Sequence, residues 1–138
     1  MFGYSNFDPP ISYDYKTTEK VVGEWVDGKP VYENCVTGTF PSLSKNNSRY
    51  AANVTSDLSA LNIDIFIRCY GNYDFISSGD TYTRTLGSVT IASSNPISGC
   101  TVVDYLTNTK ILYIIFQSYT NSLKPTDFTV FYQYTKIG

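Results

Sequence analysis

The sequence predicts an all-β fold, an antiparallel β-sandwich or jelly-roll-like domain. Its 138 residues include thirteen Tyr and eight Phe, and Thr, Val and Ile are also frequent. These residues fit pleated, half-buried surfaces, whereas the helix-favouring residues Ala and Glu occur only four and three times. Short apolar segments alternate with turn residues, which predicts about eight short strands. No longer repeat is visible in the sequence, so neither a propeller nor a solenoid is expected.

The length suits one domain, which we place at residues 15–138. Residues 1–14 contain Asp8-Pro9-Pro10. Consecutive prolines forbid helix and favour extended backbone. Residues 1–14 are therefore predicted to form an extended N-terminal arm or linker.

The first two strands are predicted over residues 21–26 and 30–37. Asp27-Gly28 between them tolerates the positive φ angles of a tight hairpin turn. A two-residue and a three-residue loop both fit this sequence. Trp25 is expected to anchor the core beside the turn.

Residues 38–62 are less regular, and we expect a long loop with one short strand near residues 49–54. Residues 56–61 predict a single helical turn capped by Ser56. The next strand, residues 62–70, alternates with period two. Ile63, Ile65, Ile67 and Cys69 are predicted to share one face. Phe66 falls among the polar residues of the other face, where it would pack on another sheet or another subunit.

Residues 71–87 are predicted to be mainly loop, although weak alternation allows a short edge strand within them. In residues 109–119, a run of six apolar residues at 111–116 predicts that both faces of this strand are covered. Residues 121–126 predict the last turn. The remaining strands are predicted over residues 87–92, 100–106 and 128–136.

The composition excludes several classes of function. The net charge is −2, and no cluster of basic residues points to nucleic acid. The longest apolar run is far shorter than the roughly 20 residues of a membrane-spanning helix. The three cysteines form no Cys-x-x-Cys pair, so we expect buried free thiols rather than a disulfide framework or a metal site.

Catalysis is not expected. The chain has no histidine, which removes the commonest general base and metal ligand, and no phosphate loop or nucleophile elbow is present. A pair of carboxylates would suffice for glycoside hydrolysis, but the sequence does not bring two of them together. The candidates are Asp57, Asp64, Asp74, Asp80, Asp104 and Asp127. We therefore predict a non-enzymatic protein without a metal or cofactor.

The tyrosines offer apolar faces and hydroxyls that suit a sugar, although we expect most of them to pack the core. Loops are the usual place for a binding site. The first predicted site is the 71–87 stretch, with Tyr73 and Tyr82 stacking on sugar rings and Asp74, Asp80 and Arg84 bonding to hydroxyls. The second is the turn containing Tyr119 and Asn121.

Three pieces of the sequence also resemble a known family. Residues 15–19 read Tyr-x-Thr-x-Glu, residues 25–32 read Trp-x-Asp-Gly-Lys-Pro-x-Tyr, and residues 134–136 read Tyr-Thr-Lys. Together they resemble the small β-domains at the C-terminal tips of phage and prophage tail fibres and baseplate proteins.

This resemblance implies a virion protein that assembles as a homotrimer with other phage proteins in the host cytoplasm and binds a carbohydrate on the bacterial surface. The start of the chain has no signal-peptide pattern, which agrees with release by lysis. Two alternatives stay open: a head-fibre or capsid decoration protein without its own ligand, and a fragment of a polysaccharide depolymerase.

Overall fold

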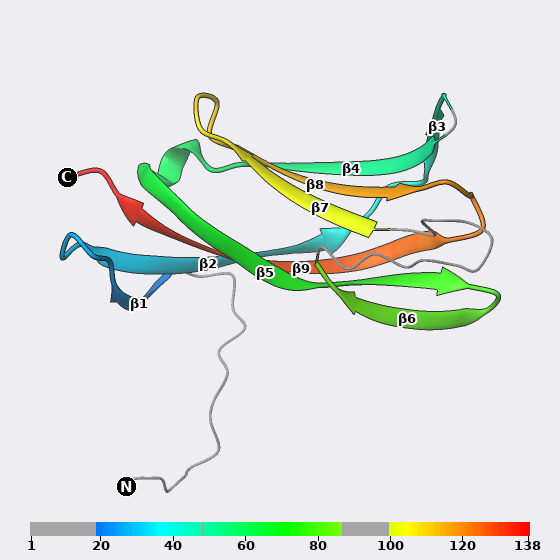
Figure 1. The fold of residues 1–138 in the computed structure, drawn as a ribbon, viewed down its shortest axis with the longest axis horizontal. Coiled ribbons are helices and arrows are strands. Elements are labelled where there is room, and N and C mark those ends of the chain that lie inside the picture. Colours follow the sequence, from blue (N-terminus) through cyan, green and yellow to red (C-terminus); the bar gives the residue numbers. More distant parts are fainter. Residues whose placement is uncertain (1–18, 48, 87–99) are drawn as a thin grey trace, which may run out of the picture.

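Two antiparallel sheets face each other in the computed structural model, which describes residues 19–47, 49–86 and 100–138 (Figure 1). The larger sheet has the strand order β1-β2-β9-β5-β6. Its strands are β1 (Lys20–Glu24), β2 (Pro30–Thr39), β9 (Lys124–Lys136), β5 (Ile63–Ser77) and β6 (Asp80–Thr85). The smaller sheet has the order β3-β4-β8-β7, with β3 (Ser44–Asn46), β4 (Arg49–Asp57), β8 (Ile111–Ser118) and β7 (Cys100–Leu106). The predicted all-β antiparallel sandwich is confirmed.

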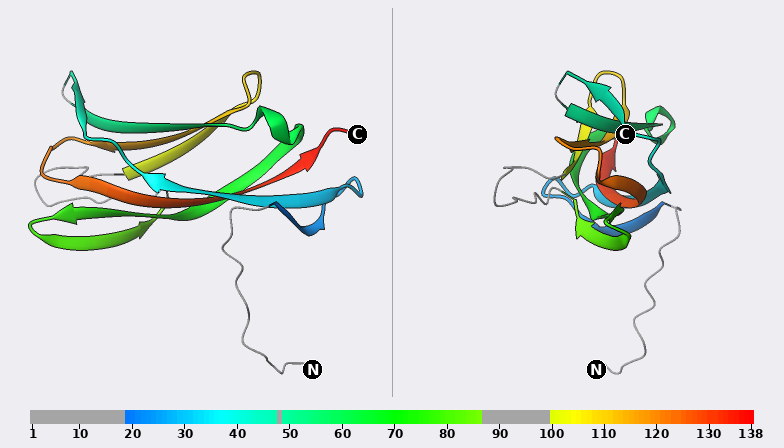
Figure 2. Two further views of the ribbon diagram at one scale, coloured as in Figure 1. Left: turned by 180° about the vertical axis from the view of Figure 1, so that it is seen from behind. Right: turned by 90° about the vertical axis from the view of Figure 1, so that its right-hand side faces the viewer.

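The core lies between the two sheets, which are seen end-on in the right-hand view of Figure 2. Side chains at alternate positions of β8 and β9 point into it because successive residues of a strand face opposite ways. Phe116 of β8 meets the ring of Tyr73 edge-on, with 5.9 Å between centroids. Phe40 bridges Phe116 and Phe128, at 6.1 Å and 5.0 Å. Aromatic rings from both sheets therefore interlock at the centre.

The first hairpin has the three-residue loop, one of the two alternatives that the sequence left open. The Trp25 N–H donates to the Lys29 carbonyl at 2.8 Å, and the Gly28 N–H donates to the Trp25 carbonyl at 2.9 Å. Gly28 has φ +88°, as the turn requires. Trp25 is only half-buried and is not part of the core cluster, so its predicted role as a core anchor is wrong.

The simple alternation predicted for residues 62–70 is also wrong. The register between β5 and β9 shifts on either side of Phe66, so that β5 contains extra, unpaired residues. These irregularities turn Ile65 outward, where it is 38% exposed. They turn Phe66 inward, where it stacks on Tyr105 of the opposite sheet at 4.5 Å. Phe66 therefore packs on another sheet, one of the two predicted possibilities.

Residues 38–62 are more regular than predicted. Strand β2 continues to Thr39, β3 is an additional strand, and β4 runs to Asp57. The helical turn shrinks to one 3₁₀ turn (Ser59–Leu61), and Ser56 does not cap it. Instead, the Asp57 carboxylate accepts a hydrogen bond from the Ser59 N–H at 2.9 Å, which lowers the pKa of Asp57.

In the region predicted to be mainly loop, the described residues 71–86 form most of a hairpin instead. Strand β5 runs through this region to Ser77, the chain turns at Ser78-Gly79, and β6 returns along it. Strand β8 is buried on one face only: Leu112, Ile114 and Phe116 are buried, while the residues between them are half-exposed. The prediction of cover on both faces is therefore wrong. The predicted strand at 87–92 and the predicted arm at 1–14 lie outside the described residues.

Candidate ligand-binding site

The structure removes Tyr73 from the predicted binding site. Its side chain is 0% exposed and lies among the core residues. Burial raises the pKa of its hydroxyl, and nearby Arg84 opposes this effect. A ring that no solvent reaches cannot stack on a sugar, so the prediction for Tyr73 is wrong.

The other residues of the first predicted site lie on the β5–β6 hairpin. Tyr82 is 44% exposed and stacks on Phe75 at 5.2 Å. Arg84 is half-buried, and its guanidinium lies 4.6 Å from the centroid of the Phe75 ring. Asp74 accepts a hydrogen bond from Thr83 Oγ1 at 2.6 Å, and Asp80 is exposed at the start of β6. Of the predicted stacking rings, only Tyr82 reaches the surface.

In the second predicted site, by contrast, Asn121 lines a cleft, while Tyr119 lines a smaller pocket nearby. The turn between β8 and β9 is fixed by its own side chains. Ser118 Oγ accepts from the Thr120 N–H at 3.1 Å and donates to the Thr120 carbonyl at 2.8 Å. Thr120 Oγ1 in turn accepts from the Ser122 N–H at 3.1 Å. These short-range bonds hold the turn in one conformation and thereby position Tyr119 and Asn121.

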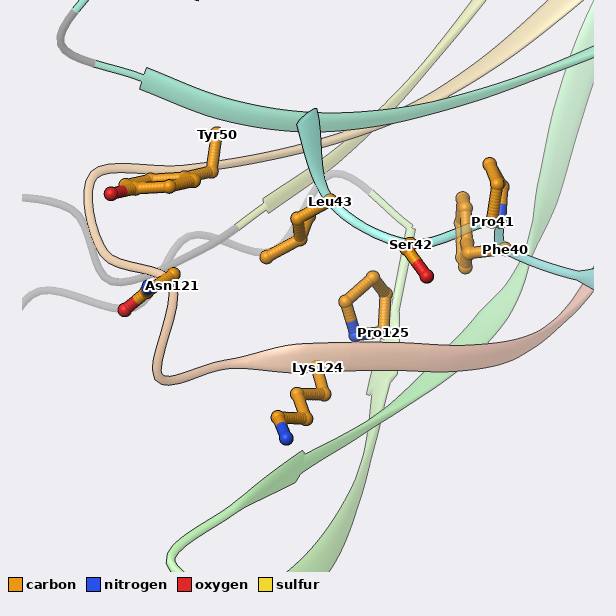
Figure 3. Close-up of a pocket in the computed structure, with 8 residues that line it drawn as sticks. All are labelled: Phe40, Pro41, Ser42, Leu43, Tyr50, Asn121, Lys124 and Pro125. Carbon is orange, nitrogen blue, oxygen red and sulfur yellow. The ribbon is translucent and has the colours of Figure 1, made fainter. Parts of the chain in front are cut away.

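Figure 3 shows the cleft beside this turn, which has a volume of about 360 Å³. The Tyr50 ring extends from β4 and lies above Asn121 in this view, and Leu43 lies beside both. Lys124 and Pro125 come from the start of β9, where the Lys124 side chain extends to the side of the strand away from Tyr50 and Leu43. The remaining wall is the segment that follows β2. The full lining is Phe40, Pro41, Ser42, Leu43, Tyr50, Asn121, Lys124 and Pro125.

The wall after β2 is anchored to both layers of the sandwich. The Phe40 N–H donates to the Thr126 carbonyl at 2.7 Å, and the Phe40 side chain is buried against Phe116 and Phe128. The cleft is therefore built on the rigid core, and its shape does not depend on an unsupported loop.

Of the basic residues at this end of the sandwich, only Lys124 belongs to the lining of the cleft, while Arg49 lines a second, smaller pocket with Tyr119. Lys45 Nζ lies 5.9 Å from the centroid of the Tyr50 ring. Arg49 bonds to the Tyr119 hydroxyl at 3.3 Å, and its guanidinium lies 5.4 Å from the centroid of that ring. None of the eight lining residues is acidic.

Four of the residues quoted for the family resemblance meet at the opposite end of the sandwich. Glu19 accepts a hydrogen bond from the Tyr134 hydroxyl, and its other oxygen lies 2.7 Å from Lys136 Nζ. The same ammonium lies 4.6 Å from the centroid of the Tyr32 ring. Burial, and then Glu19, raise the pKa of Tyr134. We call Glu19, Tyr32, Tyr134 and Lys136 the motif cluster.

Lys29, in the first hairpin, makes further contacts at this end of the sandwich. Lys29 Nζ lies 2.8 Å from Asp64 Oδ2 and 3.4 Å from the carbonyl of Lys136. Its hydrogen bond with Asp64 raises the pKa of Lys29. The motif cluster and Lys29 therefore join the first hairpin to the last strand at this end of the sandwich.

The described residues contain no group of three or more His, Cys, Asp or Glu arranged to hold a metal ion. Cys35, Cys69 and Cys100 are free, but only Cys35 is buried, so the expected burial of all three is wrong for the other two. Several of the candidate aspartates have structural partners: Asp57 bonds to Ser59, Asp64 pairs with Lys29, and Asp127 accepts from Thr39. Within the described ranges no helix has the length and apolar character needed to cross a membrane.

Sequence reasoning found Asn121 and missed the rest of the cleft. Tyr50 and Lys124 stand more than seventy residues apart, in strands of different sheets. The only sequence signal at these positions is the pair Pro41 and Pro125, which mark the ends of strands and do not by themselves indicate a site.

The chain gives no significant match when it is compared with protein-family models, with curated proteins and with solved structures.

Proposed function

We propose that this chain is a non-enzymatic domain of a phage virion, located at the tip of a tail fibre or baseplate appendage, that binds a carbohydrate on the bacterial surface. The observation that carries the proposal is the cleft at the β3–β4 end of the sandwich. Its lining combines the half-buried ring of Tyr50, two prolines and the polar residues Ser42, Asn121 and Lys124. An apolar platform beside a few hydrogen-bonding groups is the general composition of a saccharide site.

The resemblance of the motif cluster supports the phage assignment. Its residues come from the three matched pieces of the sequence and pack against one another. A set of residues that closes the fold would persist in a family while the binding end changes with the host. The assignment to a virion follows from this resemblance, and the assignment to a receptor site follows from the cleft.

The proposal includes a homotrimer. The first hairpin supports it, because Val21 and Val26 are 60% and 92% exposed and exposed apolar patches often mark interfaces. Phe131 is half-buried and stacks on Tyr70 at 5.1 Å on the outward face of the larger sheet. Three weak sites on one trimer would reinforce one another through multivalency. Light scattering at micromolar concentration should give three times the mass of the chain, and a monomer mass would contradict this part of the proposal.

The binding proposal is tested by adsorption of the purified, labelled chain to a panel of bacterial strains. We expect adsorption to at least one strain, and loss of adsorption after periodate oxidation of the cells, which destroys surface sugars. Tyr50→Ala should weaken adsorption about tenfold, since a stacked aromatic contributes roughly 1 kcal/mol or more. Tyr82→Ala is the matched control, because it removes an exposed tyrosine from the β5–β6 hairpin.

Other results would favour other functions. If Tyr82→Ala abolished adsorption and Tyr50→Ala did not, the receptor site would lie on the β5–β6 hairpin, with Asp80 and Arg84 as its neighbours. If no strain adsorbed the chain, a head-fibre or decoration protein would be the better interpretation. A fall in the viscosity of capsular polysaccharide after incubation with the chain would indicate a depolymerase.

A further inference from the structure

The cleft beside the β8–β9 turn has no charged group that faces its interior. None of the eight described residues of the lining is acidic. The one basic residue among them, Lys124, extends to the side of β9 away from Tyr50 and Leu43 (Figure 3). A carboxylate or an ammonium placed in this cleft would lose water without gaining a partner of opposite charge, which is costly. The lining therefore favours an uncharged ligand.

Apolar side chains form part of the cleft wall. Leu43 is half-buried and packs against the core cluster, so its side chain is a fixed part of this wall. Figure 3 shows it beside the ring of Tyr50, and Pro41 and Pro125 belong to the same lining. A ring face suits a sugar ring. A neighbouring aliphatic side chain suits a methyl group, because each apolar carbon that leaves water contributes to binding.

Three uncharged polar groups complete the lining: the amide of Asn121 and the hydroxyls of Ser42 and Tyr50. These side chains form no hydrogen bond with any residue in the described ranges 19–47, 49–86 and 100–138. Asn121 belongs to the β8–β9 turn, whereas Ser42 belongs to the segment after β2, on another side of the cleft (Figure 3). An amide can donate and accept, and so can a hydroxyl. The two residues can therefore bond to opposite edges of one ligand group.

An acetamido group meets all of these conditions. It is uncharged, it has a methyl group, and it has an N–H donor and a carbonyl acceptor on opposite edges. A sugar that has only hydroxyls lacks the methyl group. An acidic or amino sugar has a charge that no inward-facing group of the described lining can pair.

We propose that the cleft binds an uncharged saccharide through an acetamido group. The Asn121 amide would donate to the acetamido carbonyl, and the Ser42 hydroxyl would accept from the acetamido N–H. The methyl group would lie on Leu43, and one face of the sugar ring would lie on Tyr50. This inference rests on the proposed carbohydrate-binding function and names the class of sugar.

The test measures binding of the purified chain, by calorimetry or ligand-detected NMR, to oligosaccharides of N-acetylhexosamines with different linkages. Each is paired with two altered forms, one with a hydroxyl in place of the acetamido group and one deacetylated to an ammonium. We expect at least one acetamido member to bind about tenfold more tightly than either altered form. The hydroxyl form loses an amide hydrogen bond and the methyl contact, and the ammonium form finds no acid in the described lining.

Variants locate the effect. Asn121→Asp keeps the shape of the side chain and removes its N–H donors. It should weaken binding of the acetamido form about tenfold and strengthen binding of the ammonium form, because the new carboxylate can pair with it. Asn53→Asp makes the same change at an exposed position of β4 and is the matched control. It should change neither affinity, and an equal effect of the two variants would show that charge alone is responsible and overturn the proposal.

Failure of this inference can be separated from failure of the proposed function. If an altered form binds as tightly as the acetamido form, or if Asn121→Asp keeps the preference, the acetamido proposal is wrong while carbohydrate binding stands. If no member of the panel binds but the chain adsorbs to cells in a periodate-sensitive way, the acetamido proposal is likewise wrong. If periodate-sensitive adsorption is also absent, both proposals fail.

Discussion

The two ends of this sandwich use similar residue types in different ways, one to stabilise the fold and the other to line a cleft. At the end that holds the motif cluster, lysine, glutamate and tyrosine bond to one another, and the Tyr134 ring is fully buried. At the cleft end, lysine, tyrosine and asparagine line an open volume of about 360 Å³. The comparison teaches that the residues easiest to recognise in the sequence stabilise the fold, while the cleft is lined by residues that form no recognisable pattern.

The largest expected effect is at Gly71, in the strand that connects the two ends. A Cβ atom built there would lie 2.0 Å from the carbonyl oxygen of Thr129, and Gly71 has φ +149°. Gly71→Ala must therefore push β5 away from β9, at a cost of about 3 kcal/mol or more. Urea unfolding measures this loss of stability. Gly23→Ala is the control, since nothing lies within 4 Å of its Cβ, and equal stability of the two variants would contradict the β5–β9 register.

Alkaline pH should weaken the core beside the motif cluster. Burial, followed by the charges of Cys35 and Glu19, raises the pKa of Tyr132 from 10 to about 12. As the pH rises, the unfolded chain loses this proton at a lower pH than the folded chain does. The contribution of Tyr132 to the free energy of unfolding is therefore complete below pH 10 and is lost as the pH rises toward 12. The loss should be on the order of 2 kcal/mol. Unfolding midpoints measured above pH 10 should fall less for Tyr132→Phe than for the wild type, and an equal fall would contradict the prediction.

Glu19→Ala should break the motif cluster. It leaves the hydroxyl of buried Tyr134 without its acceptor and Lys136 without its carboxylate. An unsatisfied buried hydroxyl costs about 2 kcal/mol. Glu24→Ala removes the same charge from an exposed position of β1 and should be nearly neutral. If both variants unfolded at the same urea concentration, the cluster would contribute nothing to stability.

Gly28→Val tests the turn beside the same cluster. No atom lies within 4 Å of the Cβ position, so the effect is purely one of backbone conformation at φ +88°. A β-branched residue there should cost about 1 kcal/mol. Gly28→Asn should cost less, because Asn tolerates left-handed backbone. A melting temperature of Gly28→Val equal to that of the wild type would mean that the loop adopts another conformation.

Sequence patterns predicted the fold where the determinants are local. The turn at Asp27-Gly28 and the strand at residues 100–106 depend on a few neighbouring residues, and both were found. The alternation of Tyr73 and Phe75 with polar residues was also present and would have identified the second half of β5 as a strand. The irregular register around Phe66 was not predictable, because it arises from pairing with β9, a strand about seventy residues away.

The cleft could not be predicted for the same reason. Its walls come from residues 40–43, from Tyr50, and from Asn121, Lys124 and Pro125. They become neighbours only when β4 pairs with β8 and β2 pairs with β9. Asn121 was found because it stands in a polar turn, a local signal. Lys124 and Tyr50 carry no such signal, since an exposed lysine and a tyrosine at a strand start are common in any β-protein.

The smallest expected effect on the free energy of unfolding is at the cleft. Comparing it with the matched change at the motif cluster tests directly whether the two ends differ. Lys124 is exposed and forms no ion pair with any residue that the structure describes, so Lys124→Gln should change the free energy of unfolding by less than about 0.5 kcal/mol. Lys136→Gln, the matched change at the motif cluster, breaks the contact with Glu19 and should cost about 1 kcal/mol. Urea unfolding of both variants makes the comparison. If Lys124→Gln were the more destabilising of the two, Lys124 would have a structural role, and the difference between a closed end that stabilises and an open end that binds would not hold.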